Sequence, residues 1–155
     1  MATLKDAVLY HLEYTFEKEG WQPSLAMAVD GLRAAQAAWK SAPPRHSAWQ
    51  IVRHVIRWKQ ATFDDWHGRK PNYEEVERGD WQEASGTDEA WQADVLGLHA
   101  ISREFMDWVQ SLSEEDLARP VAGDDMALGI RLMRMATHDT YHAGQIRYVR
   151  ALQGA

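Results

Sequence analysis

Apolar residues recur at helical spacing in four long stretches of this sequence, and no other feature constrains the fold as strongly. The stretches cover residues 4–19, 47–66, 87–112 and 127–152. Such spacing gives each helix one apolar side, which has to be buried against a neighbouring element. No convincing strand pattern accompanies them. The 155 residues therefore predict an all-α four-helix bundle, with residues 1–155 forming a single domain.

The segment between the second and third stretches is polar and contains Pro71, Gly79 and Gly86. It has no sustained period, so it reads as a long connection, as does the later "ARPVAGDDM". A connection of about 20 residues exceeds what two adjacent antiparallel helices need. We therefore expect a crossover, with the second and third helices running in roughly the same direction.

Composition excludes several classes of protein. The chain has no cysteine, so a metal site would have to use His, Asp or Glu, and a reducing cytoplasm is the expected location. The net charge is -6 and no segment carries a basic stripe, which argues against nucleic acid as a partner. No apolar run approaches the roughly 18 residues of a membrane span, and the N-terminal stretch lacks signal-peptide character.

Two histidines of the last stretch, His138 and His142, are the first candidates for chemistry. At about 100° per residue, His142 falls near the apolar side and His138 about 60° from it. Side chains four residues apart on a helix can converge on one ion. The pair alone is a weak signal, because hydrogen-bonded core or surface histidines show the same spacing.

A third inward-leaning histidine, His54, lies in the middle of the second stretch, about 60° from its apolar side. Buried imidazoles need partners, and three without a carboxylate cluster are well satisfied by a divalent cation. The residues by themselves leave a metal site and an ordinary polar core about equally favoured.

The segments "HSAWQIVRHVIRW" and "HDTYHAGQI", with "WQPSL" at residues 21–25, resemble the DinB-like superfamily. This superfamily includes YfiT-like metal-dependent hydrolases and bacillithiol or mycothiol transferases. The resemblance spans nearly the whole chain. It implies an up-down-down-up four-helix bundle, often a homodimer, that holds a divalent metal through His54, His138 and His142.

Four further polar residues have competing interpretations. Gln145, one turn after His142, is either a catalytic group reaching a metal-bound water or substrate, or a cap on the polar edge of the core. Asp139 is either a partner that orients a ligand imidazole or a surface residue. His46 is either at the mouth of the site or solvent-exposed. His11 faces the bundle by periodicity, as a core histidine or a fourth ligand.

The eight tryptophans divide by position. Four sit at or near the apolar stripes and are expected in the core: Trp58, Trp66, Trp91 and Trp108. Four near helix ends and loops are expected in pocket walls or an interface: Trp21, Trp39, Trp49 and Trp81.

Three neutral ligands leave a cation with its full charge and at least one open position. That ion, with zinc or nickel expected, lowers the pKa of a bound water or thiol. The sequence thus predicts a metal-dependent hydrolase or a transferase of a low-molecular-weight thiol, acting on a small-molecule substrate. No Glu occupies the position it has in H-E-x-x-H proteases. The alternative is a non-catalytic metal-binding or stress-response module with a structural ion.

Overall fold

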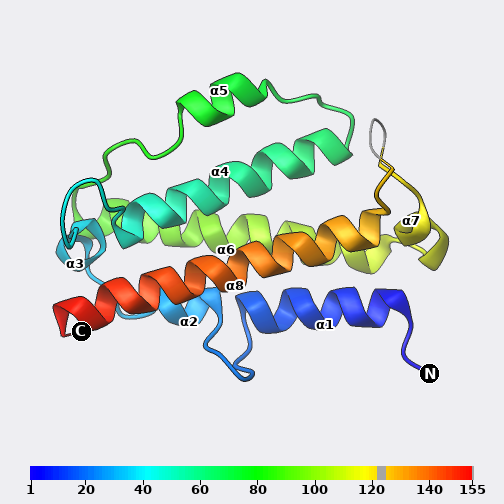
Figure 1. The fold of residues 1–155 in the computed structure, drawn as a ribbon, viewed down its shortest axis with the longest axis horizontal. Coiled ribbons are helices and arrows are strands. Elements are labelled where there is room, and N and C mark those ends of the chain that lie inside the picture. Colours follow the sequence, from blue (N-terminus) through cyan, green and yellow to red (C-terminus); the bar gives the residue numbers. More distant parts are fainter. Residues whose placement is uncertain (122–124, 155) are drawn as a thin grey trace.

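A computed structural model of the chain describes residues 1–121 and 125–154. Within those residues the structure is all-helical, apart from an isolated bridge between Pro120 and Ala127. Four long helices appear where periodicity predicted them, and four short ones lie between them (Figure 1). In chain order they are α1 (Leu4–Phe16), α2 (Leu25–Val29), α3 (Ala34–Ala38), α4 (Ala48–Trp66), α5 (Tyr73–Arg78), α6 (Asp88–Ser111), α7 (Glu114–Ala118) and α8 (Leu128–Gln153).

Three of the long helices begin at a residue whose side chain can cap them. The hydroxyls of Thr3, Ser47 and Thr87 each accept a backbone N–H from the first turn of α1, α4 and α6, respectively. This satisfies one of the donors that a helix start leaves without an intrahelical partner. At the other end of α8, Gly154 takes a left-handed conformation with φ of 71°, which suits glycine and ends the helix.

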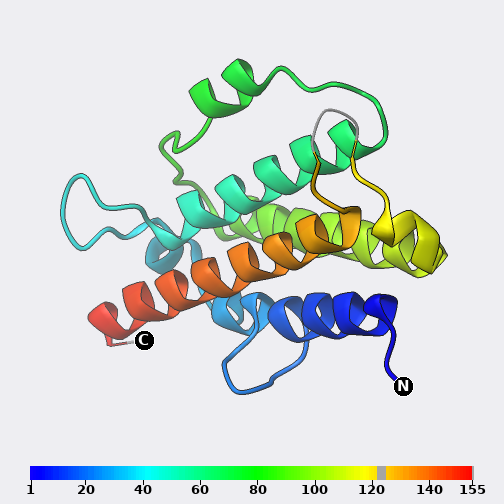
Figure 2. The same ribbon diagram turned by 45° about the vertical axis from the view of Figure 1, so that its right-hand side comes forward.

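Hydrogen bonds between helix ends fix how the long helices are placed. Arg33, just before α3, bonds Asp88 at the start of α6, and Gln153 at the end of α8 bonds the Gln36 carbonyl of α3. At the opposite end of the molecule, Lys5 of α1 bonds the Leu112 carbonyl that follows α6. Accordingly α4 and α6 both start at the α3 end and run away from it, whereas α8 ends there (Figures 1 and 2).

The segment between α4 and α6 is longer than a tight turn because it travels back along the whole of α4. It carries α5, which lies over the outer side of α4 in both views (Figures 1 and 2). The sequence predicted a connection without structure, so α5 is a correction. Its six residues bury none of their side chains and therefore show no apolar stripe; Asn72 caps the helix instead. The other predicted loop, residues 118–126, includes residues 122–124, which lie outside the described part.

The buried apolar side chains form two clusters along the bundle. One contains Trp49 and Trp91 and lies toward α2 and α3, and the other contains Phe105 and Leu132 and lies toward α1 and α7. Lys59 of α4 and Asp139 of α8 fall between them along their helices. Both are buried, and Lys59 Nζ lies 2.7 Å from Asp139 Oδ2. No helix within the described ranges is long and apolar enough to cross a membrane.

Candidate metal centre

His54 of α4 and His138 and His142 of α8 converge on one point. The Nε2 atom of His138 lies 3.1 Å from Nε2 of His54 and 3.0 Å from Nε2 of His142. One ligand atom from each of the three residues lies within 4.8 Å of the other two. Nitrogens bound tetrahedrally to zinc at about 2.1 Å are separated by roughly 3.4 Å, so the spacing suits a common ion.

The outward-facing nitrogens of two rings are held by polar partners. His54 Nδ1 lies 2.7 Å from Asp80 Oδ2, and His142 Nδ1 lies 2.7 Å from Gln145 Oε1. An ionised carboxylate and an amide oxygen only accept hydrogen bonds, so both Nδ1 atoms donate. The neutral rings then carry their lone pairs on Nε2, which is the nitrogen aimed at the common point.

Burial lowers the pKa of two of the site histidines, His138 and His142. Desolvation, followed by the neighbouring imidazoles, lowers the pKa of His138 to about 3. Desolvation, followed by His54, lowers the pKa of His142 to about 4. Protonation would place positive charges on adjacent rings in a site with little solvent to stabilise them.

This donor set fits a divalent metal ion. Lone pairs that face one another repel unless a proton or a cation lies between them, and one proton can bridge only two of the three nitrogens. His138 differs from the other two histidines in that its Nδ1 is buried without a hydrogen-bond partner within the described structure. Three neutral imidazoles are common ligands of zinc and of other late first-row metals.

Asp80 is the functional residue that sequence reasoning missed. It follows α5, and its Oδ2 accepts bonds from both His54 Nδ1 and the Trp58 indole N–H, at 2.7 and 2.9 Å. Its side chain is 8% exposed. The sequence shows only one acidic residue among several in a polar segment. No spacing rule links that segment to α4, so no signal distinguished Asp80 from its neighbours.

Trp81 covers the same side of the site. Its indole stacks between His46 and His54, at ring-centroid distances of 3.7 and 4.2 Å. Its backbone is left-handed with φ of 57°, a conformation that costs a non-glycine residue about 1–2 kcal/mol. The carbonyls of Trp81 and Gln82 accept bonds from the Gln50 amide of α4, which anchors this turn to the helix. Trp81 thus packs directly on one of the three histidines, and its predicted place in a pocket wall or an interface stays a prediction.

The structure decides between the interpretations of the other polar residues. His11 is exposed, so the prediction that it faces the bundle is wrong. The apolar side of α1 is centred on Val8 and Leu12 instead. His46 is half-buried against Trp81 and lies outside the cluster of three nitrogens. Gln145 is bonded to His142 and, through its amide nitrogen, to the Tyr141 hydroxyl.

Asp139 follows neither of its two interpretations, because it is fully buried and its partner is an ammonium rather than an imidazole. Desolvation raises the pKa of the Asp139 carboxyl, and the nearby charge of Lys59 opposes that rise. Lys59 Nζ also donates to Ser102 Oγ at 2.9 Å and lies over the Phe16 ring. The pair ties α4, α6 and α8 together one turn from the histidines.

The predicted roles of several tryptophans need revision. Trp49 is completely buried in the core rather than in a pocket wall, because its indole N–H reaches Asp94 while its rings pack on Trp91. Trp58 and Trp66 are half-buried and line a cavity, and Trp66 also packs against the core beside Phe105, as predicted.

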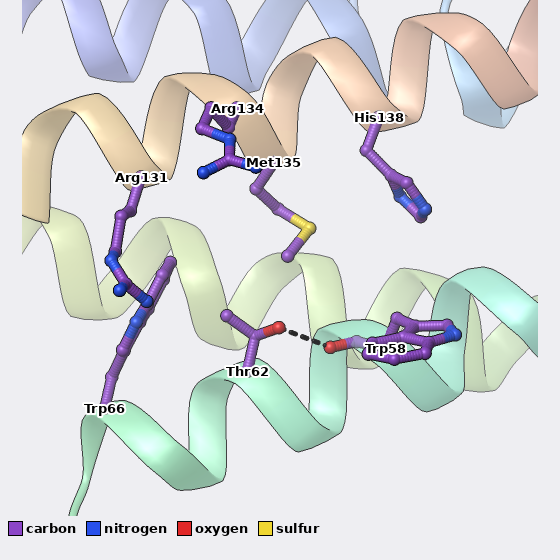
Figure 3. Close-up of a pocket in the computed structure, with 7 residues that line it drawn as sticks. All are labelled: Trp58, Thr62, Trp66, Arg131, Arg134, Met135 and His138. Carbon is purple, nitrogen blue, oxygen red and sulfur yellow. Dashed lines mark hydrogen bonds between the residues drawn. The ribbon is translucent and has the colours of Figure 1, made fainter. Parts of the chain in front are cut away.

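That cavity lies between α4 and α8 and reaches His138 at one end (Figure 3). Its volume is about 270 Å³. The α4 side contributes Trp58, Thr62 and Trp66, and the α8 side contributes Arg131, Arg134, Met135 and His138. A molecule in this cavity would therefore lie against one of the three converging imidazoles.

The described residues thus form a helical protein with a candidate metal site, made by three histidines from two helices. The sequence profile of the DinB superfamily matches residues 19–146, which is most of the chain. The protein belongs to the DinB superfamily, as the resemblance in its histidine segments indicated. Comparisons with curated proteins and with solved structures found no match.

Proposed function

We propose that this protein is a metal-dependent enzyme whose divalent ion, zinc or nickel, is held by His54, His138 and His142. A bound ion would lower the pKa of a coordinated water or thiol and polarise an oxygen of the substrate. The observation that carries the proposal is the convergence of three Nε2 atoms beside a cavity that reaches His138. Structural zinc sites usually have four protein ligands, whereas three converge here among the described residues.

The surrounding residues position the ligands. Asp80 holds the tautomer and the orientation of His54, and Gln145 does the same for His142. We therefore assign Gln145 a positioning role through His142, in place of the direct catalytic contact expected from its sequence position. Trp81 limits the access of water to His54 by stacking on its ring.

Two reactions suit such a site: hydrolysis by a coordinated hydroxide, and transfer of a low-molecular-weight thiol to an electrophile. The thiol reaction is supported by the family resemblance, and the small cavity supports a small-molecule substrate for both. We also infer the up-down-down-up arrangement of α1, α4, α6 and α8. The helix-end contacts described above support it.

The decisive experiment measures metal content and turnover together. Protein purified without a nickel column should contain about one divalent ion per chain, and His54→Ala, His138→Ala and His142→Ala should each lose it. The exposed His67→Ala is the matched control and should keep the ion. Unchanged stoichiometry and affinity in all three site variants would refute the metal site.

Turnover is then followed with a thiol and 1-chloro-2,4-dinitrobenzene, and with p-nitrophenyl acetate. Metal-dependent, saturable activity on one of them that His142→Ala abolishes would support the enzyme and separate transferase from hydrolase. A site that holds its ion but is inert toward both would favour the non-catalytic module with a structural ion.

A further inference from the structure

The cavity beside His138 carries an excess of positive charge. Two of its seven lining residues are arginines, Arg131 and Arg134, and none of the described lining residues is acidic (Figure 3). The chain as a whole has a net charge of -6, so this concentration of cations is a local exception. A cationic pocket in an acidic protein favours an anionic ligand.

Arg134 is the residue best placed to bind such a ligand. It is exposed, and its hydrogen bond goes to the Met126 thioether sulfur at 3.7 Å, a weak acceptor. Within the described residues it forms no ion pair with a carboxylate. Replacing the thioether by a carboxylate would stabilise the guanidinium, since charge-assisted bidentate pairs are stronger than a hydrogen bond to sulfur.

Helix geometry sets the distance between the charges and the histidines. Arg134 precedes His138 by one turn and Arg131 precedes it by two, which corresponds to about 6 and 10 Å along α8. In Figure 3 Arg131 and His138 extend from α8 toward α4, and the Arg134 guanidinium lies between them, close to α8. A ligand that contacts both ends therefore has its anionic group several bonds away from the atom that meets the histidines.

The walls between the two ends are largely apolar. Trp58 and Trp66 stand two turns apart on α4, and Met135 lies opposite them on α8 (Figure 3). The Thr62 hydroxyl donates to the Trp58 carbonyl at 2.7 Å and so has its proton already engaged. The volume of about 270 Å³ lies slightly below the range of drug-sized sites, which points to a small metabolite.

We propose that the substrate of this site is a small organic acid. Its carboxylate lies at Arg134 and Arg131, its apolar chain lies between Trp58, Trp66 and Met135, and its reacting end faces the histidines. The assignment of the reacting end rests on the proposed metal-dependent function. The carboxylate subsite itself depends only on residues of this chain.

The first test uses metal-free protein, because the subsite does not require an ion. Binding of 3-phenylpropionate and of its neutral analogue 3-phenylpropionamide is measured by tryptophan fluorescence and calorimetry. The acid should bind about tenfold more tightly than the amide, as expected for a charge-assisted hydrogen bond. Arg134→Gln should remove this preference, whereas Arg147→Gln should retain it. Arg147 is an exposed arginine of the same helix outside the cavity, so it matches the charge change.

The second test uses zinc-loaded protein and a probe with two ends. Adipic acid monohydroxamate carries a metal-binding group and a carboxylate, and the monoamide of the same compound lacks the charge. The acid should bind about tenfold more tightly than the amide, and Arg134→Gln should equalise them.

The outcomes separate the two proposals. Equal affinity of acid and amide in the metal-free wild type, or a preference that survives both Arg134→Gln and Arg131→Gln, would overturn the carboxylate subsite. Retained preference for 3-phenylpropionate, together with equal affinity of the hydroxamate for zinc-loaded and metal-free protein, would support the subsite and count against an open metal position.

Discussion

At the residue scale, Asp80 shows how a side chain outside the ligand set controls the site. Its carboxylate accepts bonds from His54 and Trp58, so it fixes the ring that α4 presents to the two histidines of α8. Partners of this kind select the tautomer and raise the basicity of a ligating imidazole. They also explain why a candidate metal site extends into a segment that contains no ligand.

We predict that Asp80→Asn weakens zinc affinity by about 10- to 100-fold, the usual effect of losing such a partner. The amide can still accept the bond, but it carries no charge to favour the ligating form. Chelator competition measures the affinity. Glu77→Gln removes an exposed carboxylate from the same connection and should leave the affinity unchanged. Wild-type affinity in Asp80→Asn would show that the carboxylate is dispensable.

The buried pair of Lys59 and Asp139 gives a prediction of stability. Lys59→Met leaves the Asp139 carboxyl in the core without its ammonium partner, and we expect it to lower the free energy of unfolding by about 3–5 kcal/mol. Lys59→Met with Asp139→Leu should cost clearly less than the sum of the single variants, because no charge remains buried.

Urea unfolding of the four proteins completes the cycle. Arg53→Met is the comparison, since it breaks an ion pair with Asp94 whose arginine side chain is 44% exposed and should cost about 1 kcal/mol or less. If the losses in free energy of unfolding caused by Lys59→Met and Asp139→Leu simply add in the double variant, the two residues do not stabilise each other.

At the element scale, the connection between α4 and α6 is held in place by the first turn of α4. Gln50 lies in the capping box with Ser47, and its amide nitrogen also binds the carbonyls of Trp81 and Gln82. One side chain therefore joins the start of a helix to the turn that carries Asp80. The left-handed backbone of Trp81 makes this turn dependent on such support.

We predict that Gln50→Met increases hydrogen exchange in residues 68–86 and weakens zinc binding severalfold, without changing the helix content measured by circular dichroism. The reason is that the turn loses two hydrogen bonds while Met fills a similar volume. Gln60→Met, on the exposed side of α4, is the control. An unaltered exchange pattern in Gln50→Met would mean that Asp80 is held by other contacts.

The same elements show what a sequence can predict. The long helices were predictable because each buries one side and therefore repeats its apolar residues, and His54, His138 and His142 were recognisable as inward-leaning residues in segments that resemble a family. α5 buries nothing and so leaves no pattern. Asp80 acts through a loop that returns along α4, and the Lys59–Asp139 pair joins residues 80 positions apart. These contacts depend on tertiary geometry that periodicity does not encode.

At the scale of the whole molecule, the site histidines make the stability of the metal-free protein depend on pH. The pKa values of His138 and His142 in the folded protein, about 3 and about 4, lie below the ordinary histidine value of 6.5. At pH values between those of the folded protein and the ordinary histidine pKa, the unfolded chain binds protons at these two residues and the folded chain does not. The free energy of unfolding therefore falls as the pH drops from about 6.5 toward 4, and it is restored as the pH rises.

This dependence is measured by urea unfolding with a chelator between pH 7 and 4.5. In the double variant His138→Gln/His142→Gln, the free energy of unfolding should depend much less on pH. Subtracting its values from those of the wild type removes the contribution of other titrating groups. Zinc should raise the stability of the wild type at pH 7, because an ion that binds only the folded state stabilises it. An identical pH dependence of the free energy of unfolding in the variant would show that His138 and His142 do not cause it.

The placement of the histidines on α4 and α8 also has a consequence for biosynthesis. His138 lies 84 residues after His54 in the chain. A ribosome that adds about 5–20 residues per second needs roughly 4–17 s between these two codons. During that interval the nascent chain offers a single imidazole, which holds an ion only weakly. At the proposed metal site, capture of an ion through all three histidines would therefore have to wait until α8 has been synthesised, and could not begin when α4 emerges.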